Sequence, residues 1–163
     1  MLSLISTSPE HTRQLGQALG ALLQPGDCIC LQGDLGAGKT TFVQGVAAGW
    51  GTRDEVSSPT FVLINVYRNS NEQRLFHLDT YRIESPAEAE ELDLDAMLTQ
   101  GPLLIEWPER IQPVLPAEHL WIHLGYLDDT RRQLTLRATG QRPQQLLRHF
   151  QLANHSSPHV AGR

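Results

Sequence analysis

The stretch that decides the fold is Cys28-Ile29-Cys30-Leu31, followed closely by Gly33-Asp34-Leu35-Gly36-Ala37-Gly38-Lys39-Thr40. The apolar run 28–31 has the character of a buried strand, and 33–40 fits the phosphate-loop pattern G-x-x-x-x-G-K-[ST]. A helix is expected over 39–50, ended by Gly49 and Gly51. A strand, a glycine-rich loop and a helix in this order predict a binding site for a nucleoside triphosphate.

The residue types of the loop suit this chemistry. Gly33, Gly36 and Gly38 carry no Cβ, so we expect positive φ angles that turn backbone N–H groups toward phosphate oxygens. Lys39 is expected to bind the β- and γ-phosphates, and the Thr40 hydroxyl to reach Mg²⁺. The N-terminus of the following helix adds a partial positive charge at the same place.

Length and composition limit the function. The 163 residues predict one domain over 1–153 and a disordered polar tail over 154–163. With 13 Lys and Arg against 18 Asp and Glu, the net charge of −5 disfavours direct binding of nucleic acid. Cys28 and Cys30 are expected to be buried, reduced thiols. The sequence offers no signal peptide and no apolar stretch long enough to span a bilayer, so a soluble protein is expected.

Periodicity predicts an α/β fold of the P-loop NTPase type, with three layers and a sheet of mixed parallel and antiparallel strands. The antiparallel component is inferred from a hairpin turn at Asn69-Ser70-Asn71, which departs from strict βαβ alternation. The expected strands are 2–5, 27–31, 61–68, 74–79, 102–107, 120–124 and 133–138. The expected helices are 9–23, 39–50, an acidic one over 86–98, and 144–151.

Two acids are candidates for the chemistry. Glu106 ends the apolar run Leu103-Leu104-Ile105, where an acid of a phosphate-loop enzyme commonly approaches the metal, although a surface pair with Arg110 is the alternative. Asp79 ends the strand that also carries His77, and its alternative role is a local turn or cap. Arg82 and Arg110 fit either a charge supplied to the transition state or pairing with surface carboxylates.

Four blocks together resemble the TsaE family, bacterial ATPases required for threonylcarbamoyladenosine modification of tRNA. The resemblance extends over residues 1–138. Its blocks are Gly33-Asp34-Leu35-Gly36-Ala37-Gly38-Lys39-Thr40-Thr41, Ser58-Pro59-Thr60-Phe61, His77-Leu78-Asp79-Thr80-Tyr81-Arg82 and Leu104-Ile105-Glu106-Trp107-Pro108.

The resemblance implies a cytoplasmic, Mg²⁺-dependent ATPase that assists the proteins TsaD and TsaB. Those partners modify adenosine 37 of tRNAs reading codons that begin with A, so this chain would meet tRNA only through the complex. It further implies metal binding by Thr40 and Glu106, catalysis by Asp79 and Glu106, and a switch-like loop over 57–61. The implied nucleotide contacts are Thr12, Gly36, Ala37, Gly38, Lys39, Thr40, Thr41 and Arg131.

Two other functions fit the motifs. A small-molecule kinase would use the same loop, but it needs an acceptor site for the phosphoryl group. A nucleotide-gated binding module would bind ATP and hydrolyse it only incidentally. Because no sequence block resembles an acceptor pocket or lid, the accessory ATPase is the favoured hypothesis.

Overall fold

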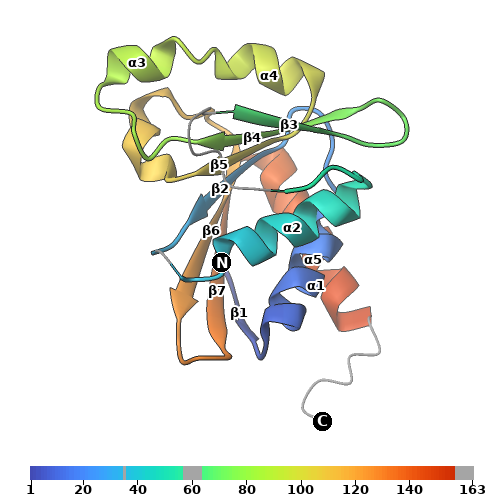
Figure 1. Ribbon diagram of the computed structural model, residues 1–163. Coiled ribbons are helices and arrows are strands. Elements are labelled where there is room, and N and C mark those ends of the chain that lie inside the picture. The colour runs from blue at the N-terminus through green and yellow to red at the C-terminus, as the bar shows by residue number, and fades with distance from the viewer. Residues whose placement is uncertain (35, 57–63, 157–163) are drawn as a thin grey trace.

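A seven-stranded sheet forms the centre of the computed structural model, which describes residues 1–34, 36–56 and 64–156 (Figure 1). The strands are β1 (Leu2–Ser6), β2 (Cys28–Gln32), β3 (Ile64–Arg68), β4 (Arg74–Asp79), β5 (Leu103–Glu106), β6 (His119–Tyr126) and β7 (Arg132–Thr139). Their order is β1-β7-β6-β2-β5-β4-β3. Strands β6, β2, β5 and β4 are parallel, and β1, β7 and β3 are joined by antiparallel pairing. The predicted mixed sheet is therefore confirmed.

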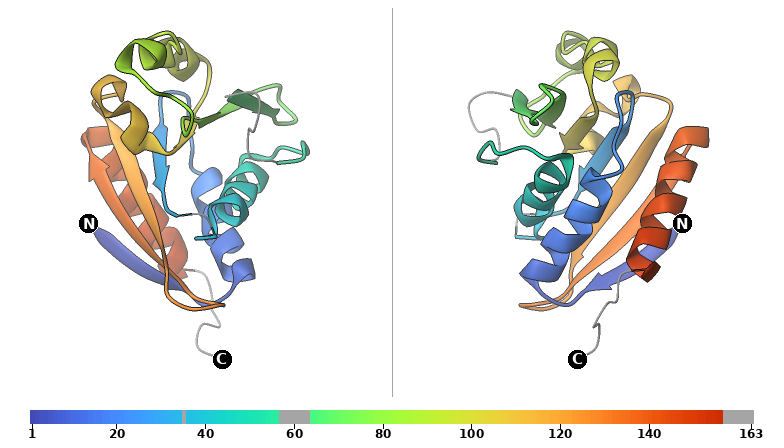
Figure 2. Two further views of the ribbon diagram at one scale, coloured as in Figure 1. Left: turned by 60° about the vertical axis from the view of Figure 1, so that its left-hand side comes forward. Right: turned by 90° about the vertical axis from the view of Figure 1, so that its right-hand side faces the viewer.

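Helices cover both faces of this sheet and give the predicted three layers (Figure 2). Helices α1 (Pro9–Gly20), α2 (Lys39–Trp50) and α5 (Gln141–Ser156) pack on one face, around a core that includes Leu19, Phe42 and Phe150. Helices α3 (Pro86–Glu90) and α4 (Leu94–Gln100), with the 3₁₀ helix η1 (Pro108–Val114), pack on the other. No helix within the described ranges is both long and apolar enough to cross a membrane.

The two cysteines of β2 face the core under α3 and α4. Cys28 and Cys30 are free and buried, as predicted. The hydrogen bond with Cys28, together with burial, raises the pKa of the Cys30 thiol well above its usual range. These thiols therefore belong to the packing of the strand that leads into the glycine-rich loop.

Three of the predicted helices differ from the observed ones. The first, expected over 9–23, ends at Gly20. The acidic helix expected over 86–98 is broken into α3 and α4, because Asp93 adopts a left-handed conformation (φ 52°) and its carboxylate accepts from the N–H of Ala96. Aspartate tolerates that conformation better than most residues and is a good N-cap. The last helix, expected over 144–151, extends to Ser156 and so includes the start of the segment predicted as a tail. Residues 157–163 lie outside the described part of the chain.

Helix α2, which leaves the glycine-rich loop, is held very close to α1. A Cβ added to Gly20 would lie 2.0 Å from the carbonyl oxygen of Val46, and one added to Gly45 would lie 2.0 Å from that of Arg13. Gly16 and Gly49 make similarly close approaches. Only glycine permits this spacing, so the pair of helices fixes where the first turn of α2 lies.

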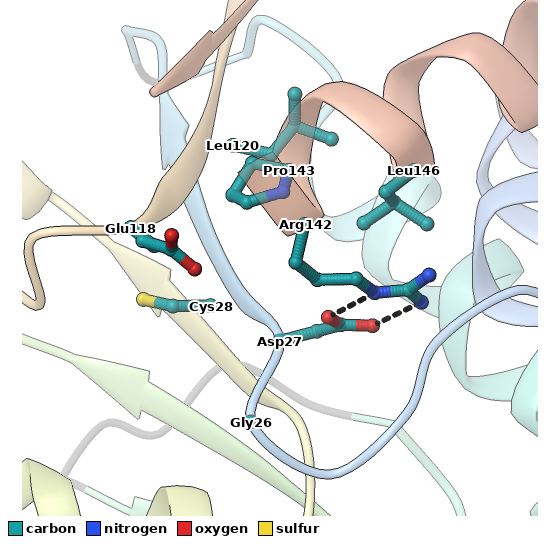
Figure 3. Close-up of a pocket in the computed structure, with 8 residues that line it drawn as sticks. All are labelled: Gly26, Asp27, Cys28, Glu118, Leu120, Arg142, Pro143 and Leu146. Carbon is teal, nitrogen blue, oxygen red and sulfur yellow. Dashed lines mark hydrogen bonds and ion pairs between the residues drawn. The ribbon is translucent and has the colours of Figure 1, made fainter. Parts of the chain in front are cut away.

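An ion pair joins α5 to the turn that enters β2. Arg142 donates from Nε to Oδ1 of Asp27 and from Nη2 to Oδ2, both at 2.9 Å (Figure 3). Asp27 is 5% exposed, and its carboxylate also accepts from the N–H of Gln24. A bidentate pair between arginine and a carboxylate is geometrically specific. It therefore fixes the start of β2 relative to α5.

Candidate functional site

The glycine-rich loop has the backbone that its sequence predicts at two of three glycines. Gly36 and Gly38 have φ angles of 81° and 97°, in the left-handed region. Gly33 differs from the expectation, because its φ lies outside that region. Glycine is needed there for a different reason, since a Cβ on Gly33 would lie 2.8 Å from the carbonyl oxygen of Leu124 on β6.

Helix α2 begins directly after this loop. Gly38 is the N-cap residue and forms no side-chain capping bond, because glycine has no side-chain acceptor. Ala37 is buried, and Thr40 and Thr41 lie in the first turn of α2. A helix start with this cap presents backbone N–H groups to an anion.

The most unusual group of the site is the side chain of Lys39. The residue is 7% exposed, and its Nζ has no hydrogen-bond partner among the described residues. Nζ lies 4.0 Å from the centre of the Trp107 ring, and Trp107 in turn packs against Tyr81 at 4.9 Å between ring centres. Burial lowers the pKa of Lys39, while the negative charges of Glu106 and Asp79 oppose that shift. The ammonium of Lys39 can therefore donate hydrogen bonds to an anionic ligand.

Glu106 lies at the carboxyl end of β5, beside the strand that enters the loop. It pairs with Leu31 of β2 on one side and with Asp79 of β4 on the other. The residue is 4% exposed, and its Oε2 is 2.6 Å from Nε2 of His77. The expected alternative, a surface pair between Glu106 and Arg110, is therefore wrong.

The backbone at this strand end is fixed by the neighbouring strand. Thr80 donates its N–H and its hydroxyl to the carbonyl oxygen of Glu106, at 3.1 and 2.9 Å. The same hydroxyl contacts the carbonyl oxygen of Trp107, which has a left-handed φ of 58°. These bonds hold the chain where it turns from β5 toward the aromatic ring under Lys39.

Asp79, the second predicted acid, ends β4 next to Glu106. Its Oδ1 accepts from the N–H of Tyr81 at 2.9 Å, so it also makes the local turn contact that was its alternative role. Burial raises the pKa of Asp79, and the charge of Glu106 adds to that rise. Asp79 and Glu106 thus form a pair of acids at adjacent strand ends, close enough to Lys39 to influence its charge.

Two other predicted contact residues have partners within the protein. Thr12 on α1 is 1% exposed, and its hydroxyl lies 2.6 Å from Oγ of Ser6. Arg131 is exposed, and its Nε lies 2.7 Å from Oδ2 of Asp128. The hydrogen bonds from Arg131 lower the pKa of Asp128 to about 2. These contacts do not join Thr12 or Arg131 to the glycine-rich loop, so their role as nucleotide contacts stays a prediction.

Sequence reasoning missed Arg132, which does contact the loop. Its Nη2 donates to the carbonyl oxygen of Gly36 at 3.2 Å, and its guanidinium lies 4.8 Å from the centre of the Tyr126 ring. Its Nε is buried without a hydrogen-bond partner in the part of the chain that the structure describes. Alternation along β7 could have indicated this position. Leu134 and Leu136 face the core on the side of α2, and Arg132, two residues before Leu134, lies on the same face of the strand.

The remaining predicted residues lie at the margin of the site. Arg110 is exposed and lies 5.2 Å from the centre of the Tyr81 ring, and Arg82 is exposed. The predicted switch-like loop over 57–61, with the block Ser58-Pro59-Thr60-Phe61, falls outside the described residues. The structure therefore brings together Lys39, Asp79 and Glu106 around the loop.

Several known proteins are similar to this chain. A family model described as "Threonylcarbamoyl adenosine biosynthesis protein TsaE" matches residues 6–134. The tRNA threonylcarbamoyladenosine biosynthesis protein TsaE of Bacillus subtilis is 40% identical over 154 residues, which are 91% of this chain and 96% of that protein. The protein of the same name from Treponema pallidum is 38% identical over 133 residues, 81% of this chain and 97% of the relative.

A solved structure extends the likeness to three dimensions. The crystal structure of YdiB from Bacillus subtilis matches with a TM-score of 0.77 at 34% sequence identity, covering 94% of this chain and 95% of that one. The family model, the relatives and the fold thus agree over most of the sequence. The chain belongs to the TsaE family.

Proposed function

We propose that this chain is a magnesium-dependent ATPase of tRNA threonylcarbamoyladenosine biosynthesis. The observation that carries the proposal is the ammonium of Lys39, buried behind a glycine-rich loop without a hydrogen-bond partner among the described residues. Burying a charge without a partner is unfavourable in free energy, and an anion that pairs with the charge offsets that penalty. The polyphosphate of ATP is such an anion, and the names of the related proteins support a role in tRNA threonylcarbamoyladenosine biosynthesis.

The residues around the loop fit ATP. Backbone N–H groups of 36–41 would bind phosphate oxygens, and Lys39 would bind the β- and γ-phosphates. Arg132 donates to the carbonyl oxygen of Gly36, so it would add positive charge next to the loop. Thr12 and Arg131 stay proposed contacts near the adenine.

Thr40 and Glu106 offer two oxygen ligands that fit Mg²⁺. The hydroxyl of Thr40 and the carboxylate of Glu106 are hard oxygen donors, the type that Mg²⁺ prefers. Bound there, the ion would offset the negative charge of the β- and γ-phosphates. Asp79 would accept a hydrogen bond from the attacking water and orient it, a task suited to a carboxylate whose pKa is raised by burial.

The proposed partners and place of action are those that the family resemblance implies. We propose that the chain acts on a complex of TsaD and TsaB in the cytoplasm and meets tRNA through that complex. Its net charge of −5 supports indirect contact with tRNA, because direct binding depends on positive charge.

The first test is ATP binding by Lys39→Ala. We expect calorimetry at fixed Mg²⁺ to show at least about a hundredfold weaker affinity, equivalent to about 2.7 kcal/mol. Arg148→Ala, an exposed change on α5, serves as the matched loss of one positive charge. Unchanged affinity of Lys39→Ala would contradict a phosphate site at the loop.

The second test is reconstituted tRNA modification with TsaD and TsaB. Wild-type protein is expected to restore repeated rounds of threonylcarbamoyladenosine formation, and Lys39→Ala is expected to fail at equal protein concentration. Hydrolysis of ATP should rise when the partners are added and should not respond to small phosphoryl acceptors. A rate of modification that does not change with this chain would refute the proposed pathway.

A further inference from the structure

A chain of buried polar side chains lies behind the carboxylate of Glu106. Nε2 of His77 is 2.6 Å from Oε2 of Glu106, and Nδ1 of the same ring is 2.9 Å from the hydroxyl of Tyr67. The three residues come from adjacent strands β5, β4 and β3, and they are 4%, 1% and 3% exposed.

The directions of the hydrogen bonds follow from what each group can donate. An ionised carboxylate only accepts, so Nε2 of His77 must carry the proton of that bond. In the neutral ring Nδ1 is then an acceptor, and the hydroxyl of Tyr67 donates to it. The carboxylate of Glu106 therefore selects the Nε2–H tautomer of His77, and the bond at Nδ1 with Tyr67 holds the orientation of the ring. His77 in turn holds one oxygen of Glu106.

The network lies on the face of the sheet that carries α2. Leu75 and Leu104 belong to the core under α1, α2 and α5. Because side chains two apart in a strand share a face, His77 and Glu106 point to the same side as these leucines. The bond from His77 takes Oε2, and among the described residues no second side chain is bonded to the carboxylate. Oε1 is thus the oxygen left for a ligand.

We infer that His77 is a positioning residue for Glu106, holding Oε2 so that Oε1 is presented to the metal, and that Tyr67 fixes the orientation of His77. The inference rests on the proposed function, because it gives the carboxylate a metal to bind. Groups that hydrogen-bond to a metal ligand typically contribute about 10- to 100-fold in metal affinity or activity. A purely structural role would instead affect folding and nucleotide affinity together.

The test compares His77→Leu, His77→Gln and Tyr67→Phe with the wild-type protein. The measured quantity is the Mg²⁺ concentration that gives half-maximal ATP hydrolysis at saturating ATP. His77→Leu should raise it about 10- to 100-fold. His77→Gln, whose side-chain amide can still donate to Glu106, should recover part of that loss, and Tyr67→Phe should show a smaller increase.

Two further measurements separate positioning from folding. Affinity for ATP in EDTA and the thermal melting temperature should change little in His77→Gln and Tyr67→Phe. His119→Leu removes a half-buried histidine of β6 whose ring contacts Trp121 and the carbonyl of Pro116, and its Mg²⁺ requirement should match that of the wild type. An unchanged Mg²⁺ requirement in His77→Leu would overturn the inference. The inference would also be overturned if His77→Leu and His77→Gln raised the Mg²⁺ requirement equally, and if each variant lost ATP affinity in EDTA and thermal stability to a similar degree.

Glu106→Gln distinguishes this inference from the proposed function. If Glu106→Gln raises the Mg²⁺ requirement and His77→Leu does not, only the positioning role fails. If hydrolysis by the wild type is absent or independent of Mg²⁺, or if Glu106→Gln matches the wild type, the proposed function fails and the inference fails with it.

Discussion

Lys39 contacts the ring of Trp107, and in the proposed function a phosphate of ATP would compete for the same ammonium. Its Nζ lies 4.0 Å from the ring centre. A cation–π contact contributes about 0.5–2 kcal/mol, and a single hydrogen bond between charged groups about 1.5–3 kcal/mol. A lysine that meets two phosphates forms more than one such bond, so nucleotide should displace it from the ring. If the proposed function is right, Trp107 would hold the lysine near the loop until ATP binds.

The two neighbouring arginines of β7 and its preceding turn offer a matched pair of variants. Arg132→Ala removes the bond to the Gly36 carbonyl and a guanidinium beside the loop. We expect about tenfold weaker ATP affinity, about 1.4 kcal/mol, by calorimetry. Arg131→Ala removes an exposed pair with Asp128, which is worth little to stability. Because Arg131 is also proposed to contact the nucleotide, Arg131→Ala tests that contact separately, and an unchanged ATP affinity in Arg131→Ala would contradict it. An unchanged affinity in Arg132→Ala would contradict a contribution of Arg132 to the phosphate site.

The sequence predicts those site residues that belong to a contiguous motif. Lys39 and the glycines of the loop follow from their spacing alone, and Glu106 follows from its place at the end of an apolar strand. The contacts of His77 and Arg132 do not, because both depend on which strands lie side by side and in which register. No local pattern carries that information.

At the scale of elements, the close approach of α1 and α2 should be the most sensitive feature. Gly45→Ala would place a methyl group 2.0 Å from the carbonyl oxygen of Arg13, which is backbone and cannot turn away. We expect a loss of at least about 2 kcal/mol in the free energy of unfolding, measured with denaturant. Gly125→Ala is the control, because its nearest contact would be an ordinary 3.6 Å. A Gly45→Ala variant as stable as Gly125→Ala would contradict the observed spacing.

Local signals predict the helix starts better than the helix interruptions. Ser8 caps α1 by accepting from the N–H of His11, as the Ser-Pro start suggests. The break at Asp93 was not predicted, because the leucines and alanines on both sides of it continue a helical pattern. One left-handed residue, stabilised by its own capping bond, outweighs that pattern.

At the scale of the whole molecule, parallel strands β6, β2, β5 and β4 bring the functional side chains to one edge. Carboxyl ends of parallel strands meet at the same edge of a sheet, which is where open α/β sheets bind ligands. The order β1-β7-β6-β2-β5-β4-β3 was not predictable, because it is set by pairings between residues far apart in sequence. The mixed character of the sheet was predictable, because the hairpin between β3 and β4 is local.

The charge of the whole chain predicts how it meets RNA. With a net charge of −5, the isolated protein should bind unmodified tRNA only weakly at about 0.15 M salt. Fluorescence anisotropy with labelled tRNA measures this, first for the chain alone and then with TsaD and TsaB present. Tight binding by the chain alone would contradict access to tRNA through the partners.

In the proposed function the loop, Lys39, Thr40 and Glu106 together bind ATP with Mg²⁺. A crystal structure with Mg²⁺ and a non-hydrolysable ATP analogue would decide the matter. We expect phosphates against the first turn of α2, Nζ of Lys39 moved from Trp107 to the phosphates, and Mg²⁺ bound by Thr40 and Oε1 of Glu106. An analogue bound elsewhere, or a metal held without Glu106, would contradict it.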